Sequence, residues 1–240
     1  MKSKITCFNF EAGRIISGKY EVISKVGSGW EGEVYLLKEA DTGIERAAKV
    51  FYPHRNPKDR SVKNYAKKLH KLRACNSLIK YIGREKLRFK GQDITFLLSE
   101  FVEGITLDTY INSYFPRGLY YYQALHIFYA VVQAVEEIHF NKEWHGDIHS
   151  ENIIIQKVGL EYELKLIDVF PVTHGIKGTI QEDVFHLCHL LYELIGGKDK
   201  YSKQPKIIKE ICCGLKTSLI KKKFRNATHL RTFLENSEWE

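Results

Sequence analysis

The chain carries the segment His145-Gly-Asp-Ile-His-Ser-Glu-Asn152, followed by the apolar run Leu164-Lys-Leu-Ile-Asp-Val-Phe170. The first segment places a carboxylate, Asp147, five positions before a carboxamide, Asn152. The second segment adds another carboxylate, Asp168, sixteen positions after the asparagine. In phosphoryl transfer, a protein mainly positions the nucleophile and holds Mg²⁺ against the phosphates. A loop followed by a strand with these polar groups suits that chemistry.

The first segment resembles the catalytic-loop pattern HRDLxxxN, and the second lies where the strand ending in DFG would be. The chain therefore resembles the eukaryotic-type protein kinase superfamily. The resemblance implies that Asp147 orients or deprotonates the attacking hydroxyl, and that Asn152 and Asp168 hold the metal ions. Each residue also has a structural interpretation, because Asp147 could close a turn, Asn152 could cap one and Asp168 could end a strand.

Two motifs in the N-terminal part of the chain match the same kinase pattern as this loop. Gly27-Ser-Gly-Trp-Glu-Gly-Glu-Val34 matches GxGxxGxV, so the resemblance implies nucleotide contacts from Gly27, Gly29, Gly32 and Val34. Glycines allow a turn to lie close over phosphates with its N–H groups pointing inward. Lys49, in Ala47-Ala-Lys-Val50, lies 22 residues after the first glycine and is the candidate for the α- and β-phosphates.

The segment Ser99-Glu-Phe-Val-Glu-Gly104, at the end of a predicted strand over residues 94–101, resembles the kinase hinge. The main-chain groups of Glu100 and Val102 are expected to face adenine. The resemblance thus implies ATP and Mg²⁺ as cofactors.

A helix is predicted over residues 61–74, where the family carries the glutamate that pairs with the strand lysine. This helix has no glutamate, and the expected position falls near Ala66 or Lys67. Asp59 and Glu85 are the candidates to replace it. An unpaired Lys49 would be less firmly aimed at the phosphates.

Other departures lie in the second half of the chain. Gly146 replaces the Arg of HRD, which indicates that control through activation-loop phosphate is absent. Val169-Phe170 replaces Phe-Gly, and only fourteen residues, without an APE motif, separate Asp168 from Asp183. Asp183 begins an almost wholly apolar run to Ile195 that resembles the central buried helix of the large kinase lobe. We expect Asp183 to hydrogen-bond the catalytic-loop backbone, to be the N-cap or a first-turn carboxylate of its own helix, or both.

The predicted fold is α+β, a single two-lobed kinase-like domain over residues 1–240. The N-lobe, about residues 1–101, should be an antiparallel sheet with one helix. A hinge at about 99–104 leads to a mainly helical C-lobe, about 105–240. A long buried helix is predicted over residues 120–141, and two helices, 205–215 and 226–234, are predicted to flank a turn at 221–225.

Composition limits the remaining possibilities. The sequence shows neither a signal-peptide run nor the roughly 18 apolar residues of a membrane span, so we expect a cytoplasmic protein without membrane contact. Five cysteines without CxxC spacing predict buried thiols rather than disulfides or zinc. The net charge of +8 could favour nucleic acid, but no aromatic and basic interleaving supports that partner.

These observations predict an ATP-dependent phosphotransferase that moves the γ-phosphoryl of MgATP to a hydroxyl, first of all to Ser or Thr of a protein. Glu151 matches a position that meets basic substrate residues in some kinases. The pattern HGDxH, which ends at His149, resembles aminoglycoside and choline kinase-like enzymes, and RIO-type kinases share the short activation segment. The first alternative is therefore a kinase of one of these types, with a small-molecule or RNA-associated acceptor. A pseudokinase scaffold that binds nucleotide without transfer is the second. The sequence does not indicate an oligomeric state.

Overall fold

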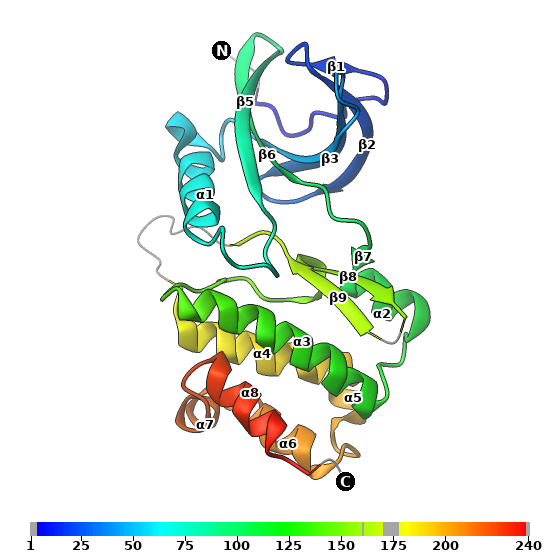
Figure 1. The fold of residues 1–240 in the computed structure, drawn as a ribbon, viewed down its shortest axis with the longest axis vertical. Helices are drawn as coiled ribbons and strands as arrows, with labels where there is room; N and C mark the ends of the chain where they lie inside the picture. Colours follow the sequence, from blue (N-terminus) through cyan, green and yellow to red (C-terminus); the bar gives the residue numbers. More distant parts are fainter. Residues whose placement is uncertain (1–3, 160, 170–177, 239–240) are drawn as a thin grey trace. The chain divides into compact units, whose positions relative to one another are not determined.

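The computed structural model describes residues 4–159, 161–169 and 178–238. Contacts divide the chain into two units, of which unit 1 is Met1–Arg73 with Ile79–Val102 and unit 2 is Ala74–Leu78 with Glu103–Glu240. The units contain a β-rich part with one α-helix and a mainly helical part, which is the predicted fold class (Figure 1).

Unit 1 is built on a six-stranded antiparallel sheet with the strand order β1-β2-β3-β4-β6-β5 (Figure 1). Its inner side chains form one apolar core with Ile5, Phe8 and Phe10 of the N-terminal segment. The strand predicted over residues 94–101 is confirmed as β6, which begins two residues earlier and ends one residue earlier than expected. The strands are β1 (Ile15–Ile16), β2 (Tyr20–Ser28), β3 (Gly32–Glu39), β4 (Glu45–Phe51), β5 (Tyr81–Phe89) and β6 (Gln92–Glu100).

A single α-helix, α1 (Arg60–Lys71), follows the 3₁₀ turn η1 (Pro57–Asp59) and packs against β5 and β6 (Figure 1). Its buried positions include Val62, Tyr65 and Leu69, which share one helix face because they are three and four residues apart. The predicted helix is confirmed, and it ends three residues earlier than expected.

Unit 2 is organised around α3 (Tyr121–Phe140) and α4 (Ile180–Leu194), which lie side by side (Figure 1). Both are buried on more than one face, as their apolar sequences predict. Helix α8 packs on α3, and α6 and α7 pack on α4. The remaining helices are α2 (Leu107–Tyr114), η2 (Ser150–Asn152), α5 (Gly197–Tyr201), α6 (Lys206–Cys212), η3 (Cys213–Leu215), α7 (Thr217–Lys223) and α8 (Ala227–Glu235).

The prediction of a turn at residues 221–225 was wrong in part. Lys221 to Lys223 are the last turn of α7, and Phe224, Arg225 and the N-cap residue Asn226 connect it to α8. Ile220 is the buried residue of this seven-residue helix, so the sequence offers too few apolar positions to show a helical period.

A small antiparallel sheet completes unit 2, with β7 (Ile105–Thr106), β8 (Ile153–Val158) and β9 (Glu161–Leu166) in that order. Residues 74–78 join this unit because Leu78 forms a parallel bridge with Leu166, whose N–H donates to the Ser77 carbonyl at 2.7 Å. Strands β8 and β9 form a hairpin, and its open end lies beside the segments that carry the candidate metal ligands.

Cys75, Cys188 and Cys212 are buried, as expected for small core side chains, whereas Cys7 is exposed and Cys213 is half-buried, so the expectation of buried thiols was wrong for these two. Across the described residues, no helix combines the length and the apolar character that crossing a membrane requires.

Candidate active site

A fully buried carboxylate, Asp183 of α4, holds the loop of residues 145–152 in place. Its Oδ2 accepts from the His145 N–H at 2.7 Å and its Oδ1 from the Gly146 N–H at 2.8 Å, which confirms the expected contact with the loop backbone. The helix itself begins at Ile180 and is capped by Thr179, so Asp183 is not its N-cap but a carboxylate of its first turn. Gly146 has φ +91°, a conformation that favours glycine.

His139 of α3 fixes Asp183 from a third direction. Its Nδ1 accepts from the Ala227 N–H at 3.1 Å, so the ring proton of the neutral form lies on Nε2. That Nε2 is 3.1 Å from Asp183 Oδ2 and donates to it. The loop is thereby tied to α3, α4 and the first residue of α8.

His145 is a structural member of the loop, as the sequence predicted. It is fully buried, its Nδ1 accepts from the Asp147 N–H at 3.3 Å, and its Nε2 lies 3.0 Å from the Ile167 carbonyl. These two bonds require the proton on Nε2 and join the loop to the residue before Asp168. The imidazole therefore has no nitrogen left to act as a base.

Asp147, Asn152 and His149 lie together. The Asn152 Nδ2 donates to the Asp147 carbonyl at 2.9 Å and to Asp147 Oδ2 at 3.0 Å, and it is 2.8 Å from His149 Nε2. Because these contacts occupy Nδ2, the Asn152 Oδ1 is the atom that can bind a cation. Amide and carboxylate oxygens are the ligands that Mg²⁺ takes.

The charges of Asp147 and His149 are coupled. Burial alone would raise the pKa of Asp147, but the hydrogen bond and positive charge of His149, with the nearby His145, hold that pKa below its usual value. The hydrogen bond to Asp147 in turn raises the pKa of His149, against the opposing effect of burial. Asp147 thus stays ionised at neutral pH, the state that can accept a proton from a hydroxyl.

Asp168 and Asn152 both lie at the open end of the β8–β9 hairpin. Ile153 pairs with Leu166 at the open end of the hairpin, and just beyond it the Ile167 N–H donates to the Asn152 carbonyl at 3.0 Å. Asp168 follows with φ +53°, a left-handed conformation that is uncommon for a residue other than glycine. The two candidate metal ligands therefore lie just outside the last residue pair of the hairpin, Asn152 before β8 and Asp168 after β9.

The segment after Asp168 is only partly described. Val169, in the position of the Phe of DFG, is fully buried, whereas Phe170 lies outside the described residues. Within the described ranges, no group of three or more His, Cys, Asp or Glu side chains could hold a metal ion. An amide and one carboxylate still fit Mg²⁺, which keeps several waters and takes phosphate oxygens when it binds with a nucleotide.

In unit 1, the turn between β2 and β3 carries the glycine-rich sequence. The Gly29 N–H donates to the Gly32 carbonyl at 2.8 Å and closes this turn. A Cβ on Gly32 would meet the Val50 carbonyl oxygen at 2.0 Å, whereas Gly27 and Gly29 have open space around them. Val34 pairs with Gly27 on β2 and with Lys49 on β4, so the register sets these three predicted residues side by side.

Lys49 pairs with a residue that sequence reasoning missed. Its Nζ is 3.1 Å from Oε2 of Glu31, within the glycine-rich turn. Neither predicted substitute is involved in this ion pair, because Asp59 accepts from Thr95 Oγ1 at 2.8 Å and Glu85 pairs with Lys19 at 3.0 Å. The signal was an acidic residue at the tip of a loop where the family rarely has one.

Trp30, beside Glu31, does not pack into the core. Its side chain is 66% exposed, and the Arg55 guanidinium lies 3.8 Å from its ring centre. The predicted hinge residues Glu100 and Val102 end unit 1, and the Glu100 N–H donates to the Lys80 carbonyl at 3.0 Å. Their contact with adenine stays a prediction.

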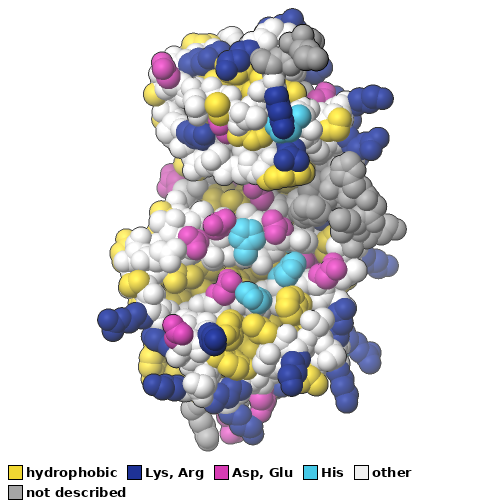
Figure 2. Space-filling model, turned by 180° about the vertical axis from the view of Figure 1, so that it is seen from behind, with side chains coloured by type: hydrophobic (Ala, Val, Ile, Leu, Met, Phe, Trp, Pro, Cys, Tyr) yellow, Lys and Arg dark blue, Asp and Glu magenta, His cyan; other side chains and the backbone are white. Residues whose placement is uncertain are grey.

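An acidic groove adjoins the loop in unit 2. It has a volume of about 410 Å³ and is lined by α2, η2 and α4, through Asp108, Ile111, Asn112, His149, Ser150, Glu151 and Glu193. Three of these side chains are carboxylates. Histidine and acidic side chains lie close together on the face of unit 2 that Figure 2 shows.

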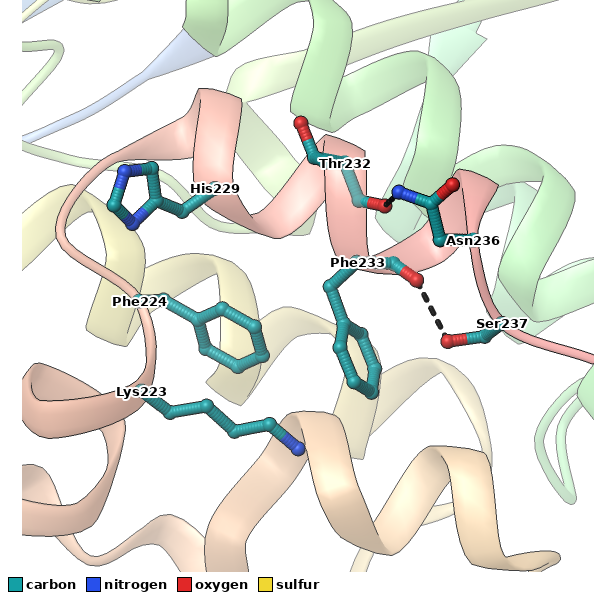
Figure 3. A pocket seen from close by; sticks show the side chains of 7 residues that line it. All are labelled: Lys223, Phe224, His229, Thr232, Phe233, Asn236 and Ser237. Atoms are coloured by element: carbon teal, nitrogen blue, oxygen red, sulfur yellow. Dashed lines mark hydrogen bonds between the residues drawn. The ribbon is translucent and has the colours of Figure 1, made fainter.

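A second hollow, of about 450 Å³, lies between the end of α7 and α8 (Figure 3). Lys223 lines it. Its Nζ donates to the Glu210 carbonyl at 3.1 Å and lies 4.1 Å from the Phe233 ring centre. This lysine is thus part of the packing between helices, and the hollow holds none of the predicted site residues.

The sheet with one helix, the helical second unit and the loop held by Asp183 define the class of protein kinases. A family model of the protein kinase domain matches residues 20–172. The chain therefore belongs to the protein kinase family.

Relatives among characterised proteins agree. Over 215 residues the chain is 32% identical to serine/threonine-protein kinase PrkC of Bacillus subtilis (strain 168), which covers 78% of this chain and 32% of PrkC. Over 192 residues it is 31% identical to cyclin-dependent kinase-like 2 of Pongo abelii, and the match covers 77% of this chain and 36% of that relative. The chain thus spans about a third of the length of these relatives.

Solved structures show the same fold. The PknI kinase domain of Mycobacterium tuberculosis matches with a TM-score of 0.68 at 16% identity, covering 94% of this chain and 98% of that domain. A mutant of the same domain matches with a TM-score of 0.73 at 17% identity, and the match covers 95% of this chain and 98% of the mutant domain. The predicted kinase fold is confirmed.

Proposed function

We propose that this chain moves the γ-phosphoryl group of MgATP to a hydroxyl group, in the first place to Ser or Thr of a protein. The observation that carries the proposal is the arrangement of Asp147, Asn152 and Asp168 around one hairpin end, with the loop fixed by Asp183. In this proposal Asp147 accepts the proton of the attacking hydroxyl, and Asn152 and Asp168 hold Mg²⁺.

Unit 1 supplies the groups for the nucleotide in this proposal. Lys49 binds the α- and β-phosphates, and the turn with Gly27, Gly29 and Gly32 covers them. Val34 and the main chain of Glu100 and Val102 receive the adenine, as in kinases that these motifs resemble. Because the reaction consumes ATP, we place it in the cytoplasm.

The acidic groove favours a basic peptide as the acceptor. Glu151, Glu193 and Asp108 line one groove of about 410 Å³ that also includes His149 of the loop. Carboxylates without an equal number of lysines or arginines attract a positively charged side chain. A Ser or Thr peptide with Arg or Lys near the acceptor is the expected substrate class.

Two other functions each have an observation in their favour. The short stretch of fourteen residues between Asp168 and Asp183 leaves little chain on which to lay a peptide, which favours a small-molecule or RNA-associated acceptor. The lack of an acidic residue in α1, described over residues 60–71, favours a scaffold that binds nucleotide without transfer.

The acceptor is tested with labelled ATP against two panels. One contains Ser and Thr peptides with basic, neutral or acidic flanks, and the other contains aminoglycosides, choline and sugars. We expect labelling of basic peptides, and a selective loss of this preference in Glu193→Gln. Labelling of small molecules alone would favour the second acceptor class, and binding of MgATP without labelling of either panel would favour the scaffold.

A further inference from the structure

Lys49 needs a partner that aims its ammonium group, and helix α1 does not provide a carboxylate. Residues 60–71, all of which the structure describes, include no Asp or Glu. The α1 side chain that approaches the ammonium is Tyr65, which is 2% exposed and has its ring centre 5.1 Å from Lys49 Nζ. An aromatic ring can attract a cation, but it does not fix it as a carboxylate does.

Glu31 provides the carboxylate from another element. Its Oε2 is 3.1 Å from Lys49 Nζ, and the two side chains are 20% and 14% exposed. Because both are largely withdrawn from water, salt screens this ion pair less than a surface pair. The other acidic side chain of this turn, Glu33, accepts instead from the N–H groups of Phe8 and Asn9, each at 3.2 Å.

The backbone of Glu31 is fixed independently of α1. Its carbonyl accepts from the Tyr52 N–H at 2.9 Å, one residue beyond the end of β4. The next residue, Gly32, lies so close to the Val50 carbonyl that a side chain there would overlap it. The carboxylate is thus anchored to the strand that carries Lys49.

We propose that Glu31 is the positioning residue for Lys49 and takes over the part that a helix carboxylate plays elsewhere. This inference rests on the proposed function, because it assigns Lys49 to the phosphates of ATP. The ion pair joins the lysine to the glycine-rich turn through one side chain. The direction of the Lys49 ammonium group is therefore fixed by a contact within the sheet and does not require a movement of α1.

The test is a double-mutant cycle with Glu31→Gln and Lys49→Met, read by calorimetric binding of MgATP and by the kcat and KM of transfer. Glu85→Gln is the matched control, because it removes an ion pair of the same sheet, with Lys19, at a more exposed place. We expect Glu31→Gln to lower kcat/KM for ATP about tenfold or more, since a misplaced group is costly in catalysis. We expect Glu31→Gln to have no further effect in the Lys49→Met background, and Glu31→Asp to recover part of the loss.

Three results would overturn the inference. Activity and affinity equal to the wild type would show that Glu31 does not aim the lysine, and an increase would show that it competes with the phosphates. A loss that persists in the Lys49→Met background would show a merely structural role. If the wild type binds MgATP but transfers nothing, the proposed function fails, and the binding cycle alone decides the inference. A wild type that does not bind MgATP would refute both.

Discussion

The protonation of His149 controls the hydrogen bonds of two candidate site residues. Its Nε2 is 2.8 Å from Asn152 Nδ2 and 3.6 Å from Asp147 Oδ2. A neutral imidazole can compete with Asp147 for one of the two amide hydrogens, whereas a protonated one can only donate and therefore turns to the carboxylate. The pH thus determines whether His149 is hydrogen-bonded to Asp147, the candidate base, or to Asn152, the candidate metal ligand.

We predict that His149 titrates above 6.5, its ordinary pKa, and that its pKa falls in Asp147→Asn. NMR titration of the imidazole measures this pKa, with Glu163→Gln on the exposed side of β9 as the control. Because the folded-state pKa is raised, the pair stabilises the fold below pH 6.5, and this contribution is lost as the pH rises through the folded pKa. An unchanged midpoint in Asp147→Asn would contradict the coupling.

At the scale of elements, the glycine-rich turn depends on close packing at one of its glycines. Gly32 sits against the Val50 carbonyl, where a Cβ would be 2.0 Å away, whereas Gly29 has no atom within 4 Å of such a position. The two glycines therefore have different functions in the same turn. Gly32 allows β3 to approach the end of β4, and Gly29 leaves room on the outer side of the turn.

We predict that Gly32→Ala lowers the local free energy of unfolding of β3 and β4 by roughly 1–3 kcal/mol, the usual cost of forcing extra atoms into a packed site. Gly29→Ala should change it by less than about 0.5 kcal/mol, as is common for exposed sites. Amide hydrogen exchange of the two strands measures both. Equal effects from the two substitutions would contradict this assignment.

Much of the fold could be predicted because long elements carry a clear period. Helix α3 lies within one residue of its predicted bounds at each end, and β6 lies within two residues of the strand predicted over residues 94–101. Short elements such as α5 and α7 could not be predicted, since five to seven residues include too few buried positions to show a period. The Lys49 partner was missed for another reason, because the acidic residue at the tip of the turn reaches Lys49 only through the strand register, which the local sequence does not fix.

At the scale of the whole chain, the loop of residues 145–152 is held by contacts within unit 2. Asp183, His139 and the backbone of Ala227 fix it from three helices of unit 2. Gly146, in the position of the phosphate-sensing arginine of the family, has a backbone conformation that an arginine would adopt only with strain. The loop should therefore be assembled in the newly folded protein.

We predict that treatment with a phosphatase leaves the rate of phosphoryl transfer unchanged. The reason is that no phosphate is needed to order the loop, and mass spectrometry confirms that the treated protein is unmodified. A protein kinase held by an arginine and a phosphate, treated in parallel, is the positive control. A large loss of rate in the treated chain, restored by preincubation with ATP, would contradict this prediction.

Transfer of labelled γ-phosphoryl from ATP to a basic Ser or Thr peptide, by the wild type and by Asp147→Asn, tests the central claim most directly. The asparagine keeps the size of the side chain but cannot accept the hydroxyl proton, so we predict that kcat falls by about a hundredfold or more. Glu163→Gln should match the wild type. Equal, low incorporation by wild type and Asp147→Asn would contradict the account.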